Sequence, residues 1–158
     1  MSRPLLSTLA AACALALPAA AHSRPVTVAA TLKNYGGNGA YLAVYLTDAK
    51  GAYVRTLWVA GGKAKYYKHL AEWNRLSAGD GKRLQGVTGA SVGQGRTLKV
   101  TADLADALID AGYEIRVDAA AEDMRDSPGE IRLPLNAANA GKPQSGKQYI
   151  ESLSFQLP

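Results

Sequence analysis

Short segments rich in β-branched and aromatic residues, each closed by a turn signal, most strongly constrain what this chain can fold into. Residues 40–47 read AYLAVYLT and residues 53–59 read YVRTLWV, with the turn DAKG between them. Runs rich in Val, Tyr, Trp and Thr are typical of strands, and two such runs around a short turn predict a β-hairpin. Residues 40–59 are therefore expected to form two paired antiparallel strands.

Further segments repeat this pattern along the chain. Strands are expected at residues 26–32, 96–102, 113–119, 129–135 and 149–157. Alternation in YEIRVDA turns Tyr113, Ile115 and Val117 to one face and Glu114, Arg116 and Asp118 to the other. Pro134 has no N–H to donate, so its strand is expected at a sheet edge. About seven strands with turns between them predict a mainly all-β fold, an immunoglobulin or fibronectin-like antiparallel β-sandwich.

One segment has helical rather than strand periodicity. In residues 65–76, Tyr66, Leu70, Trp73 and Leu76 recur on one helical face, which predicts a short amphipathic helix. Residues 103–112 allow two interpretations: a short second helix ended by Gly112, or a compact turn that joins two strands. The sandwich is therefore expected to carry one or two short helices.

The N-terminal residues 1–21 have the features of a secretory signal peptide. A basic start at Arg3 precedes an uncharged apolar run, Pro18 breaks that run, and three alanines supply a small-residue cleavage pattern after which residues 22–158 form one domain. The apolar run is shorter than the ~20 residues that a membrane span needs. An uncleaved anchor and a lipoprotein modified at Cys13 are the alternatives. Export is the favoured interpretation, with no membrane span left after cleavage.

Composition narrows the chemistry of the exported domain. Cys13 is the only cysteine, so the favoured processing leaves no thiol for a disulfide, a metal or a nucleophile. The formal net charge of the whole chain is +5, and the charges are scattered, which does not indicate nucleic acid binding. We therefore expect no nucleic acid partner.

Candidate catalytic groups are sparse. His69 and Glu72 share a helical face, but a third metal ligand is not evident. Ser91 lies in GASVG, which matches the spacing of a nucleophile elbow without its parallel sheet and following helix. The carboxylates Glu122 and Asp123 are expected in a solvated loop. The sequence thus favours a carrier or binding domain over a catalyst with its own active site.

An aromatic concentration precedes the glycine-rich stretch LQGVTGASVGQG. Trp58, Tyr66, Tyr67 and Trp73 are most simply explained by packing in the core. The alternative is that one or two of them flank a planar ligand.

Three runs carry a resemblance to a known family: YVRTLWVAGGKAKYYKHLAEWNRLS, GVTGAS and ADLADALIDAGYEIRVDAAAEDMRDSPGEIRLPL. They resemble the predicted periplasmic family called domain of unknown function 2271, over nearly the whole exported part. The resemblance implies a single-domain β protein of the periplasm. It also implies an association with membrane PepSY-type redox proteins and with flavin transferases.

The stretch VTGAS also resembles the acceptor sequence for covalent flavinylation. In that pattern a transferase uses FAD to join the phosphate of FMN to a Ser or Thr hydroxyl. By position, Thr88, Gly89 and Ala90 match the motif, Ser91 is the FMN acceptor, and Gln85 stands where the motif has aspartate. The resemblance implies an electron-transfer protein that carries covalent FMN, and the cations expected to balance the phosphate are Lys82, Arg83 and Arg96.

Two alternatives stay open for this stretch. The Thr88 and Ser91 hydroxyls can instead bond to local backbone in a glycine-rich turn. The whole chain can likewise be a non-enzymatic periplasmic interaction domain with no cofactor.

Overall fold

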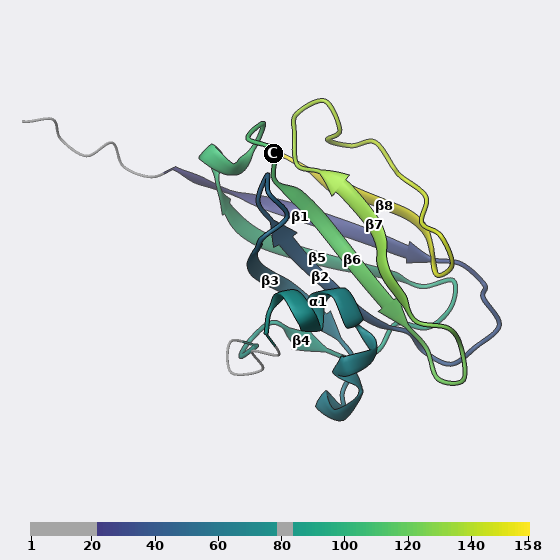
Figure 1. Ribbon diagram of the computed structural model, residues 1–158. Helices are drawn as coiled ribbons and strands as arrows, with labels where there is room; N and C mark the ends of the chain where they lie inside the picture. The colour runs from purple at the N-terminus through teal and green to yellow at the C-terminus, as the bar shows by residue number, and fades with distance from the viewer. Residues whose placement is uncertain (1–21, 79–83) are drawn as a thin grey trace, which may run out of the picture.

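The computed structural model describes residues 22–78 and 84–158. In these residues two β-sheets are stacked face to face (Figure 1). The smaller sheet has the order β5-β1-β8, and the larger has the order β4-β3-β2-β6-β7. The strands are β1 (Ser23–Leu32), β2 (Tyr41–Thr47), β3 (Tyr53–Ala60), β4 (Thr88–Gly89), β5 (Thr97–Ala105), β6 (Glu114–Ala120), β7 (Ser127–Pro134) and β8 (Ile150–Gln156). The predicted all-β sandwich is confirmed.

Strand pairing agrees with the sequence except at one place. The β2–β3 hairpin is antiparallel, and β7 with Pro134 lies at the edge of its sheet, as predicted. The short strand β4 was not predicted, and it runs parallel to β3, whereas every other pairing between the described strands is antiparallel. No local pattern in two residues distinguishes such a strand from a loop.

The main hydrophobic core lies between the sheets. Alternate residues of each strand point inward because successive side chains of a strand face opposite sides. Val28, Leu42, Val117 and Phe155 are each at most 2% exposed and bring four strands into one cluster. Each such side chain stabilises the fold by about 1.5–3 kcal/mol through removal from water.

A helical segment covers the outer face of the larger sheet (Figure 1). It consists of a 3₁₀ helix, η1 (Ala64–His69), followed by α1 (Ala71–Leu76). The prediction of one continuous helix over residues 65–76 is therefore wrong, because Leu70 between the two parts has φ −85° and ψ 69°. Leu70 and Trp73 both belong to a second hydrophobic cluster that includes Tyr45. Arg116 and Asp118, on the face of β6 that alternation turns away from Ile115 and Val117, are buried and bond to Glu72 and Trp73 of α1.

The segment after β5 resolves the second ambiguity in favour of the turn. β5 continues to Ala105, the 3₁₀ turn η3 (Asp106–Leu108) follows, and Gly112 has φ +83°. A left-handed φ of this size favours glycine, and here it lets the chain reverse into β6.

A buried carboxylate fastens the helical segment to the larger sheet. Asp118 of β6 is 0% exposed and accepts hydrogen bonds from Trp73 N (2.7 Å), Gly129 N (2.9 Å) and Tyr45 Oη (3.0 Å). Burial raises the pKa of Asp118, and the two backbone donors act in the opposite direction. One side chain thus joins α1 to β2, β6 and β7.

We expect Asp118→Ala to lower the free energy of unfolding by about 3 kcal/mol, because it leaves buried donors without an acceptor. Urea unfolding followed by circular dichroism measures this difference. Glu151→Ala is the matched control, since Glu151 is an exposed carboxylate on β8, and it should change stability by less than about 0.5 kcal/mol. Equal effects of the two variants would contradict the role given to Asp118.

Candidate functional site

The motif residues Thr88 and Gly89 are paired to the outer edge of β3. Val59 N donates to Val87 O at 2.8 Å, and Gly61 N donates to Gly89 O at 2.8 Å. This half of the glycine-rich stretch is therefore a strand, β4, with a fixed backbone.

Ser91 follows β4 on the stretch that leaves β3 and reaches β2. Val92 next to it exchanges two backbone hydrogen bonds with Ala40, of 2.9 and 2.7 Å. Ser91 itself is exposed, and a Cβ added to Gly39 would lie only 2.7 Å from its Oγ. The serine is thus presented to solvent on a backbone that is held on both sides.

Neither motif hydroxyl supports the local-turn alternative. Within residues 22–78 and 84–158, the Thr88 and Ser91 hydroxyls make no hydrogen bond to another protein group. Both residues are exposed, so their hydroxyls are accessible to solvent or to another protein.

Gly89 has a packing reason to be glycine. A Cβ at this position would lie 2.7 Å from Cζ2 of Trp58, whose ring is therefore in contact with the motif backbone. The Trp58 Nε1 atom is buried and has no hydrogen-bond partner among the described residues. The Trp58 ring, with an unused N–H donor, thus lies against Gly89, which precedes Ser91 by two residues.

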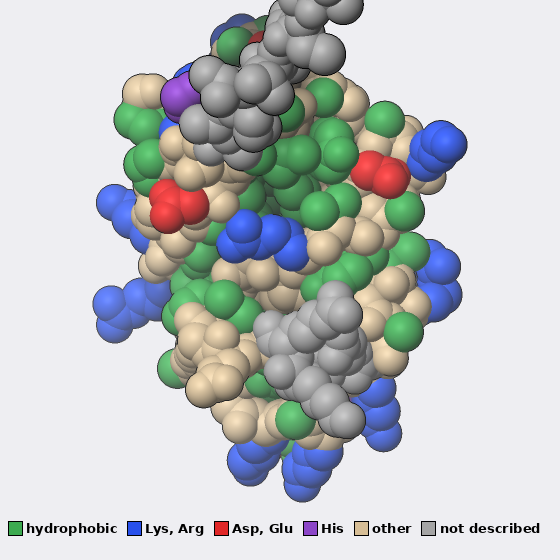
Figure 2. Space-filling view, turned by 90° about the vertical axis from the view of Figure 1, so that its left-hand side faces the viewer, with side chains coloured by type: hydrophobic (Ala, Val, Ile, Leu, Met, Phe, Trp, Pro, Cys, Tyr) green, Lys and Arg blue, Asp and Glu red, His purple; other side chains and the backbone are tan. Residues whose placement is uncertain are grey.

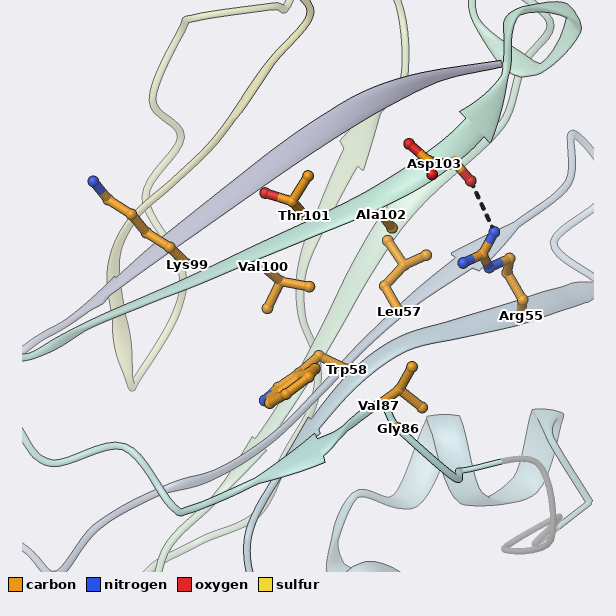
Figure 3. Close-up of a pocket in the computed structure, with 10 residues that line it drawn as sticks. All are labelled: Arg55, Leu57, Trp58, Gly86, Val87, Lys99, Val100, Thr101, Ala102 and Asp103. Carbon is orange, nitrogen blue, oxygen red and sulfur yellow. Dashed lines mark hydrogen bonds between the residues drawn. The ribbon is translucent and has the colours of Figure 1, made fainter. Parts of the chain in front are cut away.

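A groove between the two sheets opens beside Trp58. It has a volume of about 410 Å³ and is lined by β3, by Gly86 and Val87, and by β5 from Lys99 to Asp103. Figure 3 shows Trp58 between Val100 of β5 and Val87 on the motif side. Figure 2 shows hydrophobic side chains in the middle of this side of the molecule, with Lys and Arg side chains among and around them.

The cations expected beside the motif are only partly placed. Arg96 is exposed, and its backbone N–H donates to Gly93 O at 3.1 Å. Its side chain lies over Gly93, two residues after Ser91. Lys82 and Arg83 lie outside the described residues.

The other candidate residues have structural partners. His69 Nδ1 lies 3.0 Å from Asp126 Oδ2, and Glu72 accepts from Arg116 Nη1 at 2.7 Å and from Arg132 Nη2 at 3.1 Å. No group of three or more His, Cys, Asp or Glu suited to a metal occurs in the described part of the chain. Glu72 thus belongs to an ion-pair network with Arg116 and Arg132.

The aromatic residues divide between the core and the groove. Trp73 is 2% exposed and Tyr67 meets it edge to face at 5.8 Å, so packing explains both. Tyr66 is 40% exposed beside Tyr41. Only Trp58 contacts both the motif and the groove, and its proximity to Gly89 had no signal in the sequence because the two residues are far apart in the chain.

Comparison with known proteins gives one match. A family model described as "Predicted periplasmic protein (DUF2271)" matches residues 23–152. No curated protein and no solved structure matches the chain. Across the described residues, no helix is both long and apolar enough to cross a bilayer.

We expect Gly89→Ala to destabilise the fold by about 2 kcal/mol, because the new methyl group overlaps the Trp58 ring. Urea unfolding gives the value. In a Trp58→Leu background, which makes room, the added cost should fall below about 1 kcal/mol.

The matched control for this variant is Gly62→Ala. No atom lies within 4 Å of a Cβ at Gly62, and its φ is outside the left-handed region, so stability should be unchanged or rise by up to about 1 kcal/mol. A cost at Gly89 that persists without the tryptophan would show that Trp58 is not the cause.

Proposed function

The chain belongs to the DUF2271 family of predicted periplasmic proteins, and on that premise we propose that it is an electron carrier with FMN esterified to Ser91. The observation that carries the proposal is the exposed Ser91 hydroxyl directly after Thr88, Gly89 and Ala90, on backbone that is held on both sides. A modifying enzyme can reach such a hydroxyl without unfolding the domain.

The attachment requires only a hydroxyl from this protein. A flavin transferase would join Ser91 Oγ to the FMN phosphorus of FAD, break the pyrophosphate bond and release AMP together with the hydroxyl proton. The small residues Gly39 and Ala90 leave room around the acceptor. Two residues depart from the transferase's pattern: Gln85 stands in place of the motif aspartate, and Ser91 in place of the more usual threonine.

Nearby residues fit an attached phosphate and a planar ring. The guanidinium of Arg96 is exposed five residues after the acceptor, where it can balance the one negative charge of a phosphodiester. Trp58 supplies an aromatic surface beneath the motif and an unused indole N–H. The isoalloxazine supplies the redox chemistry when attached, and the protein orients it and sets its surroundings.

The electron partner in this proposal is a membrane PepSY-type redox protein, as the family resemblance implies. A tethered cofactor stays with the carrier through repeated encounters, so the domain needs no catalytic residues of its own. Its part is to expose the cofactor on a rigid sandwich.

The second candidate function is a periplasmic interaction domain with no cofactor. It is favoured by the structural role of the motif itself, since Gly89 makes room for Trp58 and Val92 pairs with Ala40. Such contacts account for these residues without any modification.

Co-expression with a flavin transferase separates the two candidates. We expect intact mass spectrometry of the exported protein to show an added FMN, less one water, in the wild type and in Ser91→Thr, and no addition in Ser91→Ala. Gln85→Asp restores the motif aspartate and should raise the modified fraction.

Thr88→Ser is the matched control, because it keeps a hydroxyl in the motif and leaves Ser91 in place. The transferase must modify a known acceptor in the same cells. An unmodified wild type and an unmodified Gln85→Asp variant under those conditions would favour the cofactor-free domain.

A further inference from the structure

Strand β5 has a long open edge. Among residues 22–78 and 84–158 it pairs only with β1, over nine residue pairs from Ser23↔Ala105 to Thr31↔Thr97, and without any register shift. An unbulged edge strand of this length presents a row of backbone donors and acceptors to another chain.

The remaining sheet edges in the described residues are protected. The edge of β8 is covered by residues 141–146, where Gly141 N donates to Phe155 O and Gln144 exchanges two bonds with Leu153. β7 carries Pro128 and Pro134, which cannot donate, and β4 is only two residues long. Protection at three edges and not at the fourth points to a partner for β5.

The free backbone groups of β5 belong to its odd-numbered residues. Leu32 N donates to Arg96 O, and Asp106 N donates to His22 O, so even-numbered positions face β1. Alternation along an antiparallel strand then turns the N–H and C=O of Thr97, Lys99, Thr101 and Asp103 outward. The contact from Arg55 Nη1 to Asp103 O at 3.0 Å, which comes from outside the sheet, agrees with this direction.

We propose that β5 pairs antiparallel with β5 of a second copy of this chain, about a two-fold axis at Thr101. Thr101 is the central residue of Thr97–Ala105, so this register overlaps the two strands over their full length. The smaller sheets then join into one six-stranded sheet across the dimer. A two-fold axis makes the interface self-complementary, as in most homodimers.

The charges of Lys99 and Asp103 favour the register with the axis at Thr101. With the axis at Thr101, Lys99 lies directly opposite Asp103 of the second copy, and the symmetry repeats the pair. Both side chains are exposed and share one face of the strand, so they meet across the interface. An axis at Lys99 or at Asp103 would instead place like charges opposite each other, which is destabilising.

Arg55 is the group that pairing displaces. Its guanidinium donates a hydrogen bond to the Asp103 carbonyl oxygen. In the dimer this oxygen instead accepts from the backbone N–H of Lys99 of the second copy. Arg55 is an exposed, long side chain and can turn into solvent. The Thr101 hydroxyl is already shared with Thr27 at 2.9 Å and needs no change.

Sedimentation equilibrium of the protein purified from the periplasm, at about 1 to 100 µM, tests the proposal. The wild type should form a reversible dimer. Lys99→Asp and Asp103→Lys each turn two attractive pairs into two repulsive ones and should raise the dimer dissociation constant at least about tenfold. The combined Lys99→Asp/Asp103→Lys variant swaps the charges and should return to within about threefold of the wild type.

The control variants separate pairing from general effects of charge and folding. Glu151→Lys alters an exposed charge on β8 and should leave the dimer unchanged. Thr101→Pro removes an outward donor at the axis and should give a monomer with the wild-type circular dichroism spectrum. A wild type that stays monomeric, or a dimer that the charge swap does not restore, would overturn the proposal.

Discussion

The buried carboxylate of Asp118 is the interaction on which the arrangement of this protein depends. A polar group without water needs hydrogen-bond partners, and Asp118 obtains them from donors on α1, β2 and the start of β7. Those contacts hold the helical segment against the larger sheet. They also enclose the second hydrophobic cluster, where Tyr45 and Val59 are fully buried.

The candidate site follows from that enclosure. The second half of β3 packs against the main core through Leu57 and Ala60 and against the helical segment through Val59, and the edge of this half pairs with β4. Trp58 projects from β3 toward the main core and leaves room above it only for the backbone of Gly89. Ser91 therefore follows β4 on a backbone that is held at Gly89 and at Val92.

Short β segments and turns were enough to predict the sandwich, because period-two alternation identifies strands without knowledge of their neighbours. Pro134 identified an edge strand for an equally local reason, its missing N–H. The sequence also identified Ser91 as a candidate, since the motif Thr-Gly-Ala-Ser is formed by four consecutive residues. The helix over residues 65–76 was mispredicted in part, because the apolar spacing runs without interruption through Leu70 whereas the backbone there is not helical.

The amino-acid sequence by itself thus determined the class of fold, the number of long strands and the residue to ask about. Only the tertiary structure decided that Asp118 is buried, that Gly89 lies on Trp58 and that one edge of β5 is unpaired among the described strands. Each of these depends on residues distant in the chain, and whether a side chain is buried or an edge is covered is a property of its neighbours in space. Local patterns carry no record of those neighbours, so the site's surroundings had to come from the folded molecule.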